Sequence, residues 1–251
     1  MTYKLFTLLI CLSFLTACKQ DAHLYKIEAK QINVTDSLEI DEDIESFIKP
    51  YRVQINKNLD SVISYAKETY SKSDGEYNTA IGNLMVDAVY EQCNPIFKSR
   101  TNRDIDFVLL NHGGIRAIIS EGNITTRTAY EVMPFENAVV VAKLKGEQVK
   151  ELISYLVTEK RAHPIAKLNL VIDKDDQLYS ATINDKPIDY NSTYYVATND
   201  YLYNGGDRMN FFKTNDSLYV LDYKIRNVLI DYFSKTDTIA PKQDNRFIKI
   251  K

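Results

Sequence analysis

The stretch DFVLLNHGGIR, residues 106–116, says most about how this chain folds. Its first part, residues 106–110, is a short apolar run typical of a buried strand, and it ends in Asn-His-Gly-Gly. A second glycine pair, Gly205 and Gly206, follows another strand-like run, residues 194–198. The chain has only eight glycines, and four of them fall in these two strand-end loops. Because glycine permits positive φ and lets backbone approach a ligand closely, the loops predict the wall of a ligand pocket.

The bulk composition is that of an ordinary globular protein. Hydrophobic residues make up 45% of the 251 residues and charged residues 26%, so one large domain or two small ones can bury a core. A net charge of −3 argues against a nucleic-acid partner, which would need a basic surface. The 18 Tyr and 10 Phe residues supply rings that can stack on a planar ligand, although most such rings pack in cores.

The N-terminus has the features of a bacterial lipoprotein precursor. Lys4 supplies a positive start, and residues 5–14 form an apolar segment too short to span a bilayer. Residues 15–18 match a lipobox, in which Cys18 becomes the lipidated first residue; the alternative is an ordinary secretory signal that ends at residues 16–17. Lipid on Cys18 would anchor the chain to the cell-envelope membrane, facing the periplasm or the outer-membrane surface. We therefore expect a signal peptide over residues 1–17, a tether over residues 18–41 and a domain over residues 42–251.

The cysteines predict no disulfide framework. Cys11 leaves with the signal peptide and Cys18 carries lipid, so Cys93 alone remains. A single thiol cannot form an internal disulfide, and no Cys-rich metal site is expected.

Hydrophobic periodicity indicates helices and strands in irregular alternation. Helical spacing over residues 44–65, interrupted by Pro50, and over residues 81–90 predicts two helices separated by a polar loop over residues 68–77. The order favours a mixed sheet, so the expected fold class is a single α+β domain. Further helices are predicted over residues 123–132, after a turn, and over 148–156 and 225–233; strands are predicted over 106–110, 138–144, 168–172, 179–183 and 194–198, with 168–172 and 179–183 paired.

The first glycine loop carries groups suited to an anion. Arg116, just past the turn, can donate in bidentate fashion to a phosphate or carboxylate, and Asn111 adds an amide that donates and accepts. Backbone amides of the loop can face the same anion. Taken alone, the segment is also compatible with a tight turn and a surface arginine. His112 is expected to be a packing or exposed residue rather than a catalyst.

Two further loops carry rings. Phe135 lies in a proline-containing loop before a strand, where it could stack on a base or simply cap the core. Tyr201 offers a second ring, and Asp207, six positions on, could accept hydrogen bonds from ribose hydroxyls. Each signal is weak alone.

Together, stretches at residues 80–88, 111–116, 134–137 and 198–207 match one family in order and spacing. Over roughly residues 68–250 the chain resembles the C-terminal domain of 5'-nucleotidases, which also serve as UDP-sugar hydrolases and 2',3'-cyclic phosphodiesterases. The resemblance implies a mixed-sheet α+β domain that grips the nucleotide, while an N-terminal metallophosphoesterase domain holds two metals.

The resemblance also implies roles for single residues. Asn111 and Arg116 would contact the phosphate side of the substrate. Phe135 and Tyr201 would sandwich the base, with Tyr201 standing where the family usually has Phe, and Asp207 would bind the ribose. The glycines that would shape the two loops are Gly113, Gly114, Gly205 and Gly206.

The sequence departs from the family pattern in three places. Family members usually carry a further substrate-side arginine before the Gly-Asn-Leu stretch, and residues 73–78 contain none. Arg208 follows Asp207 where an aromatic residue is usual, which would put a positive charge at the pocket mouth. None of the three histidines lies in an Asn-His-Glu motif, and the Asp-x-His at Asp21-Ala22-His23 falls in the expected tether, so we expect no metal site, no cofactor and no catalytic residue in this chain.

These features support more than one hypothesis. The favoured one is the nucleotide-recognition half of a split 5'-nucleotidase, acting with a separate metallophosphoesterase chain that holds a divalent metal pair. An alternative is a surface lipoprotein that binds nucleotides or nucleosides without turnover. A third is a degenerate domain kept for protein contacts.

Overall fold

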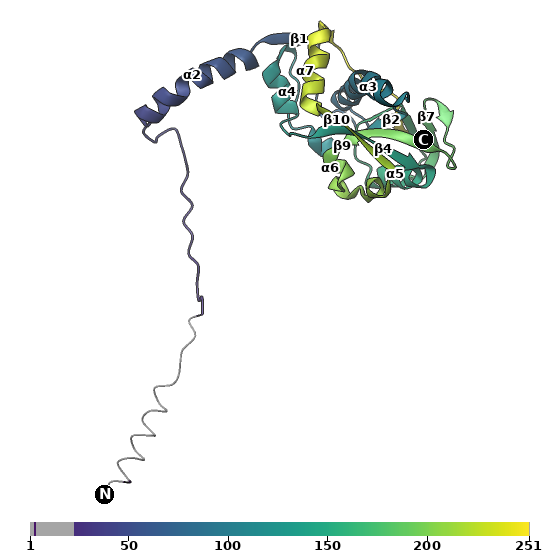
Figure 1. Cartoon of the computed structure of the whole chain (residues 1–251), viewed down its shortest axis with the longest axis horizontal. Helices are drawn as coiled ribbons and strands as arrows, with labels where there is room; N and C mark the ends of the chain where they lie inside the picture. The colour runs from purple at the N-terminus through teal and green to yellow at the C-terminus, as the bar shows by residue number, and fades with distance from the viewer. Residues whose placement is uncertain (1–2, 4–22, 251) are drawn as a thin grey trace. The chain divides into compact units, whose positions relative to one another are not determined.

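The computed structural model describes residue 3 and residues 23–250, which divide into two units, residues 1–48 and 49–251 (Figure 1). In the first unit, residues 23–40 contain no helix or strand, and all of their side chains are exposed. The predicted signal peptide, the lipobox and Cys18 lie outside the described residues. Among the residues that are described, no helix combines the length and the apolar composition that crossing a bilayer requires.

Helix α2 spans Glu42–Leu59, whereas the sequence predicted a helix over residues 44–65 that is interrupted at Pro50. The observed helix is not interrupted there, and it ends six residues earlier. The Asp41 carboxylate caps it by accepting from the amides of Asp43 and Ile44, each at 3.1 Å. The helix continues through Pro50. Proline removes one backbone hydrogen bond of the helix, but this part of the helix is exposed, so the carbonyl that loses its partner can bond water instead.

The C-terminal part of the predicted helix over residues 44–65 is instead strand β1, Val62–Ala66. It pairs antiparallel with β3, Gly122–Thr125, and parallel with β11, Thr238–Ile239. Both partners are distant in sequence, so helical spacing around residues 62–65 could not reveal the pairing. Residues 123–125 therefore also form a strand, and the predicted helix begins only at α4, Thr126–Val132.

A mixed five-stranded sheet forms the centre of the second unit, which confirms the predicted fold class. The strand order is β10 (Ser217–Lys224), β4 (Ala138–Lys145), β9 (Thr193–Asn199), β2 (Phe107–Leu109) and β5 (Ile165–Ala166). Strands β2 and β9 are parallel, whereas the other neighbouring pairs in this sheet are antiparallel.

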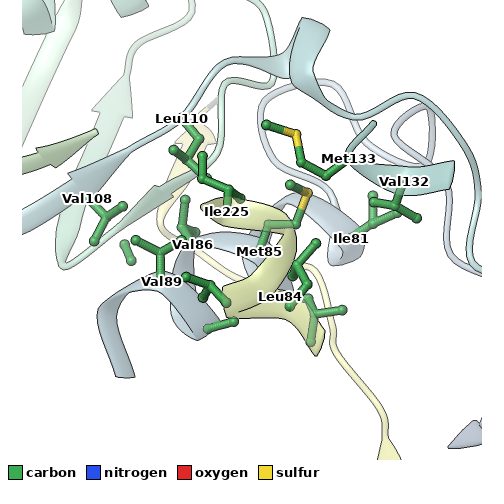
Figure 2. Packing of buried hydrophobic residues seen from close by; sticks show 14 of the residues in the cluster. Ile81, Leu84, Met85, Val86, Val89, Val108, Leu110, Val132, Met133 and Ile225 are labelled. Atoms are coloured by element: carbon green, nitrogen blue, oxygen red, sulfur yellow. The ribbon is translucent and has the colours of Figure 1, made fainter. Parts of the chain in front are cut away.

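Helices cover both faces of this sheet, which explains why β2 reads as an unbroken apolar run. Val108 and Leu110 pack in the core on the side of α3, Ala80–Thr101, and α7, Ile225–Lys235. Figure 2 shows these two residues among the apolar side chains of α3. Phe107 and Leu109 point to the opposite core, which includes the buried side chains of α5, Gly146–Glu159. In Figure 1, α3 and α7 accordingly lie on one side of the sheet strands and α5 on the other.

Helix α3 starts as predicted but runs eleven residues beyond residue 90. The Thr79 hydroxyl caps its start by accepting from the Gly82 amide at 3.2 Å. Asn102, in the left-handed region at φ 56°, ends it. Cys93 is buried on this helix, and burial raises the pKa of its thiol to about 12.

The predicted hairpin over residues 168–183 is confirmed. Strands β6, Leu168–Ile172, and β7, Leu178–Ile183, pair antiparallel with Leu168 opposite Ile183. The Asp173 carboxylate closes the turn by accepting from two amides of the connecting segment, each at 2.9 Å. The hairpin sheet is completed by β8 (Lys186–Pro187) and β12 (Phe247–Lys249).

Candidate functional site

The strand directions bring the three predicted loops to one edge of the central sheet. Because β2 and β9 run parallel, the loops that follow them leave from the same edge. Strand β4 is antiparallel to β9, with Val139 opposite Asn199, so the segment before β4 arrives at that edge too. Loops that are far apart in sequence therefore meet.

These loops enclose a cavity of about 360 Å³. Six of its seven lining residues are predicted site residues, and Asn137 is the addition. Gly114, Gly205 and Gly206 shape the loops without lining the cavity. The lining residues are Asn111, Gly113, Arg116, Phe135, Asn137, Tyr201 and Asp207.

Two asparagines join the glycine loops to each other. Asn111 is buried, and its side-chain oxygen accepts from the Asn199 amide nitrogen at 3.0 Å. The Asn199 oxygen accepts in turn from the Leu202 amide at 2.7 Å, which caps the short helix α6, Asp200–Tyr203. A side chain on Gly114 would come within 3.1 Å of the Asn111 oxygen. The relative position of the two loops is thus fixed by buried hydrogen bonds.

Arg116 is the cation of the cavity. Its amide donates to the Val132 carbonyl at 2.9 Å, and its guanidinium donates to the Gly113 carbonyl at 3.4 Å. The guanidinium carbon lies 5.8 Å from the centre of the Phe135 ring, within cation–π range. No carboxylate in the described part of the chain forms an ion pair with it. Arg116 is therefore placed to meet an anion beside an aromatic face.

The Phe135 loop is held from behind by Arg226, which the sequence interpretation missed. Arg226 is 6% exposed, and its guanidinium carbon lies 4.2 Å from the centre of the Tyr130 ring. It donates to the Phe135 carbonyl at 3.5 Å and to the Glu136 carboxylate at 2.5 Å. Lys224 also pairs with Glu136, and the two cations lower the pKa of this carboxyl to about 2. The sequence signal that could have identified Arg226 is its position beside Ile225, at the start of the predicted amphipathic helix over residues 225–233.

We expect Arg226→Met to lower the free energy of unfolding by about 2 kcal/mol and to loosen the Phe135 loop. The change keeps most of the volume but removes the stacked guanidinium and its bonds to the loop. Urea denaturation measures the loss. Lys224→Met, which removes the exposed partner of the same carboxylate, should cost clearly less. Equal losses in the two variants would contradict a special role for Arg226.

Tyr201 and Asp207 form one unit on the second glycine loop. The Tyr201 hydroxyl donates to one Asp207 carboxylate oxygen at 2.9 Å and accepts from the Asp207 amide at 3.3 Å. A side chain on Gly206 would come within 2.4 Å of the Tyr201 ring, so only glycine lets the ring lie this close. Asp207 and Arg208 both have positive φ, 49° and 63°. The Tyr155 hydroxyl supports this backbone by donating to the Asp207 carbonyl at 2.8 Å.

The two histidines near the loops are packing residues in this structure. Nδ1 of His112 lies 3.3 Å from the Ala162 carbonyl, and burial lowers the pKa of this imidazole. His163 is 1% exposed, and burial lowers its pKa to about 4. Both imidazoles are therefore neutral at pH 7.

Two cations stand outside the cavity lining. Lys72 directly precedes residues 73–78, the stretch that lacks the arginine usual in the family. Its ammonium group donates to the Ile115 carbonyl at 2.8 Å, which places a positive charge beside the first glycine loop. Arg208, expected at the pocket mouth, instead lines a neighbouring hollow of about 250 Å³ with Arg161, Glu159 and Tyr155. That hollow shares only Asp207 with the cavity.

The described residues do not fit the metal pair that the resemblance implies for a catalytic domain. They contain no group of three or more His, Cys, Asp or Glu side chains that could hold a metal ion. The cavity itself offers one carboxylate, Asp207, and no histidine. The geometry suits an aromatic ligand that carries an anion.

A family model described as "5'-nucleotidase, C-terminal domain" matches residues 58–214, more than half of the chain. The chain belongs to the 5'-nucleotidase C-terminal domain family. The match includes all three loops of the cavity.

Two curated proteins are similar to parts of the chain. An apyrase of Tabanus yao is 24% identical over 233 residues, covering 84% of this chain and 42% of the apyrase. Protein UshA of Escherichia coli K12 is 35% identical over 109 residues, covering 41% of this chain and 19% of UshA. The chain thus spans less than half the length of these curated relatives.

The fold is shared with solved 5'-nucleotidases. A 5'-nucleotidase precursor from Thermus thermophilus superimposes with a TM-score of 0.70 at 22% identity. The superposition covers 82% of this chain and 43% of that structure. At this identity the likeness concerns the fold, and the assignment of site residues depends on the geometry above.

Proposed function

We propose that this chain binds nucleotides in the cavity at the sheet edge and is the substrate-recognition part of a 5'-nucleotidase-like hydrolase. One observation carries the proposal: two exposed aromatic rings, Phe135 and Tyr201, line the same small cavity as an arginine without a carboxylate partner among the described residues. Large exposed rings in a concave site are typical of ligand-binding surfaces. Family membership favours a nucleotide as that ligand.

Different lining residues of the cavity suit the base, the phosphate and the sugar of a nucleotide. The faces of Phe135 and Tyr201 would stack on the base, a contact worth about 1–3 kcal/mol per base. Arg116 would bind the phosphate through charge-assisted hydrogen bonds, with Lys72 adding positive charge behind the same loop. Asp207 would face the sugar between them.

Hydrolysis would need metal ions that the described residues do not fit. We infer that a separate metallophosphoesterase polypeptide supplies the metal pair and that this chain presents the nucleotide to it. The same proposal places the chain at the bacterial cell envelope through lipid on Cys18, on the periplasmic or outer-membrane side.

Mixing the purified chain with a candidate metallophosphoesterase, a divalent metal and AMP tests this two-chain proposal. We expect phosphate release well above that of the metallophosphoesterase alone, and loss of the gain with Arg116→Ala. No gain over the partner alone would contradict a role in catalysis. Calorimetry with AMP and adenosine on the chain alone separates the alternatives, because equal affinities would indicate nucleoside capture without turnover.

A further inference from the structure

The segment before helix α2 carries a strand pattern that the single chain does not use. Apolar and polar residues alternate strictly over residues 25–30, where Tyr25, Ile27 and Ala29 are separated by charged residues. They alternate again over residues 31–34, where Ile32 and Val34 each follow a polar residue. Strict alternation over about four to eight residues is typical of a β-strand with one buried face. Residues 25–34 are called the alternating segment below.

The alternating segment forms no strand in the structure, and its apolar side chains lie in solvent. The exposed fraction of Tyr25, Ile27, Ile32 and Val34 lies between 76% and 97%. No residue of the segment belongs to a β-sheet, and none of its backbone groups bonds to the backbone of another described residue. The apolar face and the backbone groups of a potential strand are therefore both left without a partner in the described part of the chain.

The open edge of a sheet in another polypeptide would satisfy both the face and the backbone. Such an edge offers a row of unpaired N–H and C=O groups, and an added strand bonds to them while its alternate side chains pack on one face of the sheet. Tyr, Ile and Val are favoured in strands, and a β-bulge accommodates the one-residue change of phase at Lys30 and Gln31. A lipid surface fits less well, because it offers an extended backbone no row of hydrogen-bond partners.

The position of the alternating segment along the chain indicates which polypeptide this is. The family match begins at residue 58, and the segment precedes it, on the N-terminal side of helix α2. In the arrangement that the resemblance implies, a metallophosphoesterase domain precedes the C-terminal domain. The segment thus lies on the side of the chain that such a domain would join.

We propose that residues 25–34 bind the separate metallophosphoesterase chain by adding a strand to an open edge of one of its sheets. The apolar side chains from Tyr25 to Val34 would pack on that sheet, while Lys26, Glu28 and Lys30 stay in solvent. Lys26 already pairs with Glu28, two residues on, which is the spacing of side chains on one face of a strand. This inference rests on the two-chain function proposed above and deepens it by naming the surface through which the chains associate.

Two variants of the full chain, each mixed with the metallophosphoesterase, a divalent metal and AMP, test the inference. Ile32→Asp puts a carboxylate on the apolar face, where strand pairing would have to bury it. We expect the chain concentration that gives half of the maximal gain in phosphate release to rise by at least about tenfold. Asn33→Asp is the matched control, because it introduces the same side chain and charge at the next residue, on the solvent face. It should change that concentration by less than about threefold.

Amide hydrogen exchange reports the added strand directly. Mixing the wild-type chain with the metallophosphoesterase should slow exchange in residues 25–34, because strand pairing engages amides that have no backbone partner in the single chain. Ile32→Asp should lose this protection. Its AMP affinity, measured by calorimetry on the chain alone, should equal that of the wild type, because Ile32 is 80% exposed and does not line the cavity.

The outcomes separate the inference from the function on which it rests. Equal behaviour of Ile32→Asp and Asn33→Asp, or no slowing of exchange in residues 25–34, overturns strand addition while the two-chain function stands. Protection that appears in the chain alone with dimer formation, or with phosphatidylethanolamine–phosphatidylglycerol vesicles alone, assigns the segment to a second copy or to a membrane and also overturns the inference. No gain in phosphate release by the wild type overturns the two-chain function and this inference with it.

Discussion

Arg116→Ala is expected to weaken AMP binding by about 10–100-fold while changing adenosine binding by less than about threefold. Hydrogen bonds to charged groups contribute about 1.5–3 kcal/mol, and each 1.4 kcal/mol is a factor of ten. Arg116 has no ion-pair partner among the described residues, and its only side-chain hydrogen bond there goes to the Gly113 carbonyl at 3.4 Å. Truncation should therefore leave the fold intact. Calorimetry with both ligands measures the effect.

Arg208→Ala is the matched control for this prediction. Arg208 carries the same charge on the second glycine loop but lines the neighbouring hollow. We expect its loss to change AMP affinity by less than about threefold, mostly through long-range charge. If Arg208→Ala weakens AMP binding as much as Arg116→Ala, or if adenosine binding falls in parallel, Arg116 is not the phosphate contact.

Phe135→Ala is expected to weaken AMP and adenosine binding alike, by about 10–100-fold. Stacking on an aromatic ring contributes about 1–3 kcal/mol per base and does not depend on the phosphate. The ring is 41% exposed, and its loop is held through the Phe135 carbonyl and Glu136, not through the ring. The free energy of unfolding should therefore change little. Calorimetric titration of the variant with AMP and adenosine measures the loss of affinity, and a urea denaturation curve measures the free energy of unfolding.

Tyr179→Ala provides the comparison for a ring that lies elsewhere. Tyr179 is 69% exposed on β7 and does not line the cavity. Its removal should leave both affinities unchanged. A loss confined to AMP in Phe135→Ala would place this ring near the phosphate instead of the base.

Much of the fold could be predicted because its signals are local. The apolar run that becomes β2 needs no distant partner to be recognised, since both of its faces are buried. The prediction was wrong at residues 62–65, where apolar spacing fits a helix but pairing with β3 and β11 makes a strand. Such pairing depends on segments that are distant in the sequence, so the local spacing of apolar residues cannot predict it.

The candidate site likewise contains residues that the sequence could reveal and contacts that it could not. Arg116, Phe135 and Tyr201 follow from motif order, and the structure brings them to one cavity. Arg226 acts through packing behind the Phe135 loop, which no motif marks. The hydrogen bond between Tyr201 and Asp207 depends on side-chain geometry; the sequence placed both residues at the site but could not show that one occupies the other.

A calorimetric titration of the chain with AMP, run beside the double variant Arg116→Ala/Phe135→Ala, tests the central claim most directly. The claim predicts saturable binding of one AMP per wild-type chain and no measurable binding by the folded double variant. Absence of AMP binding by the wild type, or equal binding by the double variant, would contradict it.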